Sequence, residues 1–216
     1  LENTGKTKIV ALDKTGTLTK GEPVVTDIIP TENSSSSELV FIASSLEKNS
    51  EHPLGKAVVK YAIENNIKTS DVSDFKTLSG SGLSAFINGE KTVGGKFDFI
   101  SDYCNISDDM KEKADKLSDE GKTPLYFAKN DKLTGIIAVS DELKEDSIKA
   151  VETMKKSGLL VVMITGDNER TAKAVAEKAG IEKFYAGVTP DEKGKIIEKL
   201  KSEGRTAMVG DGINDA

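Results

Sequence analysis

The chain places a carboxylate, Asp13, directly after the apolar run Ile9–Leu12 and at the head of the segment Asp-Lys-Thr-Gly-Thr-Leu-Thr, residues 13–19. Such a run is typical of a buried strand, and open α/β sheets perform their chemistry at the carboxyl ends of strands. A carboxylate there can attack phosphorus as a nucleophile. Because the attacked group carries negative oxygens, the site also needs a divalent cation and fixed positive donors.

Two loops offer oxygen ligands for that cation. Asp211 lies in the segment Gly-Asp-Gly-Ile-Asn-Asp, residues 210–215, directly after the apolar run Ala207–Val209. It could share a Mg²⁺ with Asp13 and with the main-chain carbonyl of Thr15, because hard oxygen ligands suit this ion.

Further side chains are expected to hold phosphate oxygens. Thr165, Gly166 and Asp167 follow a run of six apolar residues, and a hydroxyl with a bare glycine amide can hold phosphoryl oxygens where the next helix begins. Lys193 is expected to be the positive donor, and Asn214 a further phosphate contact. Asp167 is expected to orient its neighbours.

Each motif alone has a plain structural explanation. Asp and Gly are common in turns, Thr-Gly-Asp-Asn can cap a helix, and Gly-Asp-Gly can be a hairpin turn. Together, each at the carboxyl end of a strand, they favour phosphoryl transfer. Two alternatives stay open at this point. One is a free-standing phosphatase or phosphotransferase, and the other is a nucleotide-sensing module without chemistry.

The elements that position these residues alternate between apolar runs and helical patterns, which indicates a doubly wound α/β fold with a parallel sheet. Helices are expected to end at Gly158, Gly180 and Gly204, since glycine commonly follows a helix. The expected strands and helices are Ile9–Leu12, Asp146–Ser157, Leu159–Ile164, Glu169–Ala179, Asp191–Glu203 and Ala207–Val209.

Residues 28–132 have a different pattern and are expected to form an inserted α+β domain on an antiparallel sheet. A Ser-x-x-Glu capping box at Ser35 and a proline at position 53 predict two helix starts. Short runs separated by glycines predict strands between Val72 and Gly95. The predicted division is therefore 1–27 and 133–216 for the α/β domain and 28–132 for the insert.

Composition limits the possible partners. The chain has 216 residues and a net charge of −6, which argues against a nucleic-acid partner. Its single cysteine, Cys104, fits a reducing compartment. No apolar run approaches the roughly 20 residues that span a bilayer, and the start does not resemble a secretory segment. A soluble, cytosolic chain is expected.

With these motifs the chain resembles the heavy-metal-transporting branch of the P-type ATPases, within the haloacid dehalogenase-like superfamily. Residues 13–19 are similar to its phosphorylation motif, Thr165–Asp167 to its second motif, and 210–215 to its hinge motif. The resemblance covers essentially the whole chain. It implies that Asp13 accepts the γ-phosphoryl group of ATP with Mg²⁺ as cofactor. Residues 28–132 would then be the nucleotide-binding domain and the flanks the phosphorylation domain.

The segment Ser-Glu-His-Pro-Leu, residues 50–54, is similar to the His-Pro locus of heavy-metal pumps, and copper is the expected cargo. The resemblance implies that His52 contacts adenine and that Glu47 reads its amino group. Gly80 and Gly82 match a glycine element that lets the nucleotide approach the backbone. One departure is Gly95, where the family usually has asparagine.

The resemblance also implies a catalytic fragment of an integral membrane protein, facing the cytosol. No actuator segment with Thr-Gly-Glu and no membrane helices occur in the chain, and the family continues beyond the hinge motif where this chain ends. Thr15 stands where many related phosphatases carry a general acid and base, so slow turnover is expected. The alternative is a soluble haloacid dehalogenase-like phosphatase with a cap domain.

Overall fold

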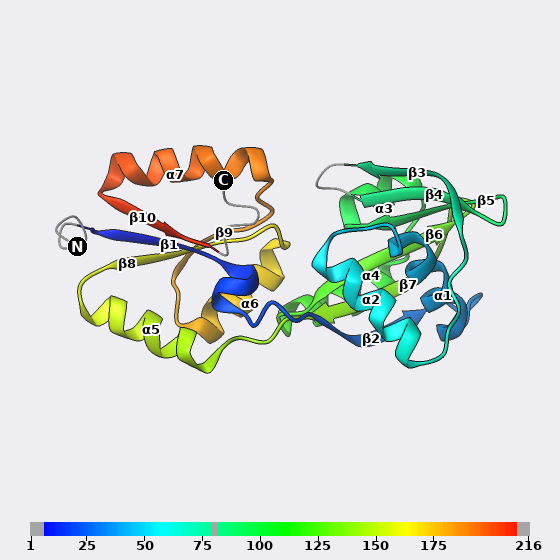
Figure 1. Ribbon diagram of the computed structural model, residues 1–216, viewed down its shortest axis with the longest axis horizontal. Helices are drawn as coiled ribbons and strands as arrows, with labels where there is room; N and C mark the ends of the chain where they lie inside the picture. The colour runs from blue at the N-terminus through cyan, green and yellow to red at the C-terminus, as the bar shows by residue number, and fades with distance from the viewer. Residues whose placement is uncertain (1–6, 79–81, 211–216) are drawn as a thin grey trace. The chain divides into compact units, whose positions relative to one another are not determined.

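The computed structural model describes residues 7–78 and 82–210. Its internal contacts divide the described chain into two compact units. One comprises residues 7–22, 119–121 and 141–210, and the other comprises residues 23–78, 82–118 and 122–140. Figure 1 shows the helices and strands of both units.

The first unit is built on a four-stranded parallel sheet with the strand order β10-β1-β8-β9. Helices pack on this sheet, as Figure 1 shows. The strands are β1 (Ile9–Asp13), β8 (Leu160–Ile164), β9 (Lys183–Tyr185) and β10 (Thr206–Val209), and the helices are α5 (Glu145–Lys156), α6 (Glu169–Ala179) and α7 (Pro190–Glu203).

Successive side chains of the central strands point to opposite faces of this sheet and are buried on both. Val10 and Leu12 pack into a cluster with apolar residues of α5 and α6. Ile9 and Ala11 point to the other face, where Leu200 of α7 covers them. A strand buried on both faces needs a continuous apolar run, which is the pattern that predicted it. The predicted doubly wound parallel architecture is therefore confirmed.

The second unit is a six-stranded antiparallel sheet with the order β2-β7-β6-β5-β4-β3. Its strands are β2 (Val24–Pro30), β3 (Val72–Leu78), β4 (Gly82–Ile87), β5 (Glu90–Gly95), β6 (Thr123–Lys129) and β7 (Lys132–Ser140). Its helices are α1 (Ser36–Glu47), α2 (Pro53–Glu64), α3 (Phe97–Tyr103) and α4 (Asp108–Asp119). The expected α+β unit on an antiparallel sheet is thus present.

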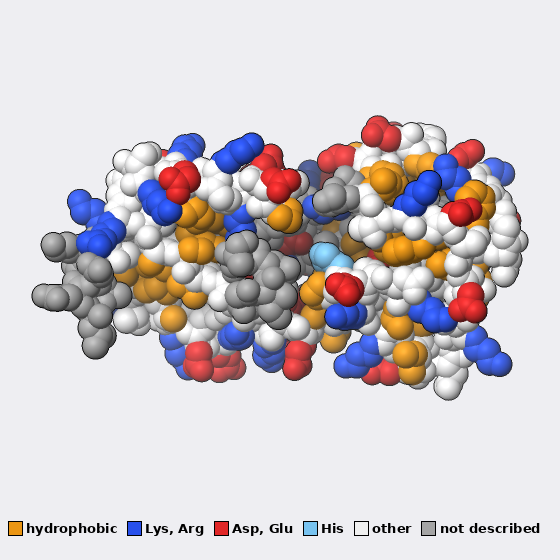
Figure 2. All heavy atoms as spheres, turned by 45° about the horizontal axis from the view of Figure 1, so that its top comes forward, with side chains coloured by type: hydrophobic (Ala, Val, Ile, Leu, Met, Phe, Trp, Pro, Cys, Tyr) orange, Lys and Arg blue, Asp and Glu red, His pale blue; other side chains and the backbone are white. Residues whose placement is uncertain are grey.

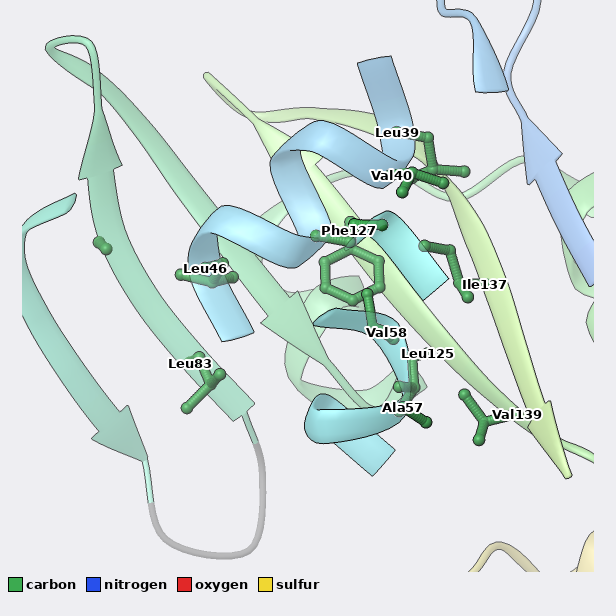
Figure 3. Close-up of a cluster of buried hydrophobic side chains, with 13 residues drawn as sticks. Leu39, Val40, Leu46, Ala57, Val58, Leu83, Leu125, Phe127, Ile137 and Val139 are labelled. Atoms are coloured by element: carbon green, nitrogen blue, oxygen red, sulfur yellow. The ribbon is translucent and has the colours of Figure 1, made fainter. Parts of the chain in front are cut away.

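Helices cover both faces of the antiparallel sheet. Figure 3 shows the first face, where Phe127 of β6 lies against Leu39, Val40 and Leu46 of α1. Apolar residues of α3 and α4 pack on the other face against residues such as Tyr126. The apolar clusters between the sheet and its helices, one on each face, form the core of this unit.

The helix starts in this unit follow the cap residues of the sequence. The Ser35 side chain accepts a hydrogen bond from the Glu38 backbone N–H at 3.1 Å, so the predicted cap of α1 is present. Helix α2 begins at Pro53, as its favoured first-turn position predicts.

Along the chain, β2 is the first strand of the second unit and β7 is the last, and the two strands pair with each other. Except for residues 119–121, the described residues of the predicted insert, 28–132, belong to this unit, and the paired strands continue beyond both ends of the insert to Val24 and Ser140. Within residues 7–78 and 82–210, no helix is long and apolar enough to cross a membrane.

Candidate active site

Asp13 ends β1, and the five residues that follow form a tight loop, Lys14–Leu18. Gly16 has a φ of 72°, a left-handed conformation that glycine adopts without steric cost. The Thr19 N–H closes the loop by donating to the Lys14 carbonyl at 3.0 Å. The buried strand and its closed loop therefore hold the Asp13 carboxyl, whose side chain is 20% exposed, at the edge of the parallel sheet.

Lys193 reaches Asp13 from the first turn of α7. Its Nζ lies 2.9 Å from Oδ1 of Asp13. A capping box fixes the start of this helix, because Glu192 accepts hydrogen bonds from the N–H and hydroxyl of Thr189. The ammonium therefore lies beside the carboxylate, where the positive donor expected from the sequence would have to be.

Thr165, Asp167 and Lys14 form a buried network. The Thr165 hydroxyl donates to Oδ2 of Asp167 at 3.0 Å, and the Asp167 N–H donates back to that hydroxyl at 3.2 Å. Nζ of Lys14 lies 2.5 Å from the same Oδ2, with both side chains less than one-tenth exposed. Asp167 thus orients two neighbours. Lys14 was not singled out from the sequence, although it follows Asp13 directly.

Gly166 is exposed at the end of β8, two residues before Asn168 caps α6. A Cβ there would lie 3.4 Å from the Val188 carbonyl oxygen, which is ordinary van der Waals contact. A glycine just before a helix of 11 residues stands where backbone N–H groups can bind phosphate oxygens.

The expected metal ligands are only partly described. The expected ligand Asp211 lies outside the described residues. The expected phosphate contact Asn214 and the expected nucleotide contact Gly80 also lie outside them. Asp13 and the Thr15 carbonyl supply hard oxygens, the donor type that Mg²⁺ prefers. The described ranges contain no cluster of three Asp, Glu, His or Cys side chains that could hold a metal. The donors present fit Mg²⁺, with Asp211 as the further expected ligand.

His52 lies in the second unit, as the N-cap of α2. Its Nδ1 accepts a hydrogen bond from the Leu54 N–H at 3.2 Å. In a neutral ring with Nδ1 as acceptor, the proton is on Nε2. The side chain is exposed, and Figure 2 shows the single histidine of the chain at the surface. The cap therefore fixes the ring orientation and leaves the ring accessible to a ligand.

Glu47 is the last residue of α1 and is only 8% exposed. Burial raises the pKa of its carboxyl to about 7, while a hydrogen bond from Ser50 lowers it. Among the described atoms its buried Oε2 has no hydrogen-bond partner, and the residue lines a surface hollow of about 450 Å³. Gly55 packs against it, since a Cβ there would overlap Oε2. A ligand N–H could satisfy this carboxyl oxygen.

Gly82 begins β4 and pairs with Gly95 of β5. A Cβ at Gly82 would clash with the Gly94 carbonyl and lie 2.6 Å from the Phe99 ring. At Gly94 a Cβ would lie 2.6 Å from the Phe127 ring. These glycines therefore have a packing role in the sheet, in addition to the role expected toward a nucleotide.

The predicted residues fall into two sets. Asp13 contacts Lys193, and Thr165 contacts Asp167, all in the parallel-sheet unit. Glu47, His52 and Gly82 lie in the antiparallel-sheet unit. The first set is a carboxylate and ammonium pair beside a buried polar network at strand ends, which defines an enzyme site of the haloacid dehalogenase type.

Comparisons with known proteins agree with this class. Residues 7–216 match the profile of the haloacid dehalogenase-like hydrolase family. The chain belongs to this family, and within it the chain is a catalytic region of the heavy-metal P-type ATPase class.

Two similar proteins of known class are P-type ATPases. The chain is 41% identical over its whole length to the silver exporting P-type ATPase of Salmonella typhimurium, of which it covers 26%. It is 40% identical, again over its whole length, to the probable copper-importing P-type ATPase A of Enterococcus hirae, of which it covers 29%. The chain thus spans about a quarter of the length of these relatives.

Solved structures agree as well. A structure of the catalytic domain of the CPx-ATPase CopB-B, described in terms of conformational changes upon nucleotide binding, matches 99% of this chain with a TM-score of 0.77 and 30% identity. The match covers 75% of that structure. A zinc-transporting PIB-type ATPase matches 99% of the chain with a TM-score of 0.63 and 37% identity, and 34% of that structure is covered.

Proposed function

We propose that this chain binds ATP and transfers its γ-phosphoryl group to Asp13, as the catalytic region of a heavy-metal cation pump. The observation that carries the proposal is the contact between Asp13 and Lys193 at the end of β1, beside the buried Thr165–Asp167 pair. A nucleophile with a cation and hydroxyl donors is what attack on a phosphoryl group needs. In this assignment the parallel-sheet unit is the phosphorylation domain.

In the proposed reaction a bond forms between a carboxylate oxygen of Asp13 and the γ-phosphorus, and the bond from that phosphorus to the bridging oxygen of ADP breaks. Lys193 and Thr165 then hold the transferred phosphoryl oxygens, with the Gly166 amide and Asn214 as further donors. Mg²⁺, held by Asp13, the Thr15 carbonyl and Asp211, supplies positive charge when bound. Asp167 keeps Lys14 and Thr165 in place.

The antiparallel-sheet unit is the proposed nucleotide-binding domain. His52 offers an exposed ring that can stack on adenine, and Glu47 offers a buried acceptor for an amino group. Gly80 and Gly82 are proposed to let the nucleotide approach the backbone. The related CopB-B structure is described in terms of nucleotide binding, which supports ATP as the ligand.

Turnover of the aspartyl phosphate by this chain alone is proposed to be slow. Related phosphatases carry a general acid and base two positions after the nucleophile, where this chain has Thr15. In the whole pump an actuator domain would supply water activation, and membrane helices would carry the cation. We propose copper as that cation, because copper appears in the names of several relatives, and a cytosolic position for the chain.

The experiment is incubation with γ-labelled ATP and Mg²⁺, followed by an acid quench, for the unaltered chain and for Asp13→Asn. The proposal expects label that survives acid, is released by hydroxylamine, and is lost in Asp13→Asn. Label of equal amount in both proteins would contradict Asp13 as the acceptor. Steady-state release of phosphate at the rate of a dedicated phosphatase would instead favour the phosphatase alternative.

A further inference from the structure

The Asp141 carboxylate is a hydrogen-bonding centre that the proposed reaction does not use. Its Oδ2 accepts a hydrogen bond of 2.5 Å from the Thr19 hydroxyl. Its Oδ1 accepts from the Gly21 and Glu22 N–H groups at 3.1 and 3.2 Å. Asp141 therefore joins the segment that leaves the Asp13 loop to the segment that returns from β7.

Thr19 carries this connection into the Asp13 loop. Its side chain is fully buried, and its Oγ1 accepts a hydrogen bond of 3.2 Å from the Gly16 N–H. A hydroxyl has a single proton to donate. When Thr19 directs that proton to Asp141, its lone pairs face the Gly16 N–H. The hydroxyl oxygen also lies 3.1 Å from the Lys14 carbonyl, but the charged Asp141 carboxylate at 2.5 Å is the stronger acceptor, so it orients the hydroxyl with its lone pairs toward the Gly16 N–H.

The Gly16 N–H and the Thr15 carbonyl belong to one planar peptide unit, so holding one fixes the direction of the other. The dihedral angles of Thr15 (φ −71°, ψ 129°) and Gly16 (φ 72°, ψ −21°) are those of a type II turn. In a type I turn the peptide between these two residues is flipped. Glycine permits both forms, so an anchor is needed to select one.

Two side chains that follow Asp141 in the chain also contact the loop after Asp13. Nζ of Lys144 donates to the Gly16 carbonyl at 2.5 Å, and the Ser147 hydroxyl donates to the Thr17 carbonyl at 3.3 Å. These bonds fix the peptides that follow Gly16. The bond from Thr19 fixes the peptide that precedes it, which carries the proposed metal ligand.

We propose that Asp141, acting through Thr19, is a positioning residue that orients the Thr15 carbonyl toward Mg²⁺. This inference rests on the proposed function, because it takes that carbonyl as a metal ligand. It adds a role that the motif alone does not contain, since Asp141 lies 122 residues from Thr19 in the sequence. The role is positioning, because Asp141 acts on the carbonyl only through Thr19 and Gly16.

The test is a titration of the folded chain with Mn²⁺ as a substitute for Mg²⁺, with bound ion measured from the loss of the electron paramagnetic resonance signal of free Mn²⁺. Thr19→Val removes the acceptor for the Gly16 N–H, and Asp141→Ala removes the charged acceptor of the Thr19 hydroxyl, so that only the Lys14 carbonyl is left to orient it. Each is expected to weaken Mn²⁺ binding about fivefold to tenfold, the size of one lost hydrogen bond.

Two variants serve as controls. Thr19→Ser keeps the hydroxyl and is expected to bind Mn²⁺ like the unaltered chain, which a general packing defect would not allow. Glu142→Gln alters the neighbouring carboxyl, whose ion pair with Lys20 is exposed, and is expected to have no effect. Thermal unfolding of each variant confirms that it is folded at the titration temperature.

The outcomes separate this inference from the proposed function. Unchanged Mn²⁺ affinity in folded Thr19→Val overturns the positioning role and leaves the proposed function intact. If Thr19→Val does not fold, unchanged affinity in Asp141→Ala, where the altered side chain is only half-buried, overturns it equally. Unchanged affinity in Asp13→Asn contradicts the metal site of the proposed function itself, and this inference with it.

Discussion

The Lys193 ammonium lies 2.9 Å from the Asp13 carboxylate, although 180 residues separate the two in the sequence. Both side chains are about one-fifth exposed, so the pair is shielded yet open to a substrate. A cation held at this point can stabilise charge on a transferred phosphoryl group better than a mobile surface lysine can, because it requires no reorganisation during the reaction.

Lys193→Gln is therefore expected to lower the rate of acid-stable labelling by about a hundredfold, the typical effect of losing one preorganised charge-stabilising donor. The rate is measured by rapid quench with γ-labelled ATP. Lys195→Gln, two residues along the same helix and exposed, is the matched control and should label normally. Equal rates for the two variants would contradict the role of Lys193.

Asp167→Asn removes the charge that pairs with the buried Lys14 ammonium. The free energy of unfolding is expected to fall by about 3–5 kcal/mol, because a buried ion is left without its counter-charge. Urea denaturation measures the change. The double variant Lys14→Met with Asp167→Leu should recover much of this loss, since it leaves no buried charge. A double variant less stable than Asp167→Asn would show that the ion pair itself stabilises the fold.

Glu47 makes stability depend on pH. Its pKa is raised from 4.5 to about 7 in the folded chain, so between these values the folded carboxyl keeps a proton that the unfolded chain releases. Stability is therefore lost as the pH rises through this window, by up to about 3 kcal/mol in total.

Glu47→Gln should abolish this loss, so its stability relative to the unaltered chain should rise between pH about 4.5 and pH about 8. Urea denaturation at several pH values measures the difference. Glu64→Gln alters an exposed carboxyl in the neighbouring helix and should leave the pH profile unchanged. Parallel pH profiles for Glu47→Gln and the unaltered chain would contradict the burial argument.

His52 has two separable roles, because its Nδ1 caps α2 while its ring remains exposed. His52→Asn should preserve the cap, since asparagine is a favoured N-cap residue, whereas His52→Ala should cost about 1 kcal/mol of stability. Both should weaken ATP binding about tenfold or more, because base stacking on a ring contributes about 1–3 kcal/mol. Isothermal titration calorimetry measures the affinity. Normal affinity in His52→Asn would exclude a base contact by the ring.

The sequence predicts the parallel-sheet unit well because its strands are buried on both faces. Continuous apolar runs such as Leu160–Ile164 can hardly be mistaken, and glycine marks the end of α6 at Gly180. Neither β2 nor β7 is predicted from the sequence, because more than 100 residues separate them and only their pairing shows where the unit begins and ends. Helix α3 has seven residues, too few to show a helical period.

The candidate site, like the fold, is only partly predictable from the sequence. Motif spacing singled out Asp13, Thr165 and Lys193, since each follows a strand or starts a helix at the same sheet edge. The ion pair of Lys14 with Asp167 and the hydrogen bond of Asp141 with Thr19 depend on side-chain direction and on contacts between distant segments, which a single sequence does not contain. The predicted roles of Asp211, Asn214 and Gly80 concern residues outside the described ranges and stay predictions.

The most direct test of the central claim is to locate the phosphoryl group at residue level. After reaction with ATP and Mg²⁺, borohydride reduces an aspartyl phosphate to homoserine, and peptide mass spectrometry identifies the altered residue. The account predicts homoserine at position 13, dependent on ATP and absent when borohydride is added before the nucleotide. Homoserine at another aspartate, or ATP bound with no reduced residue at all, would contradict it.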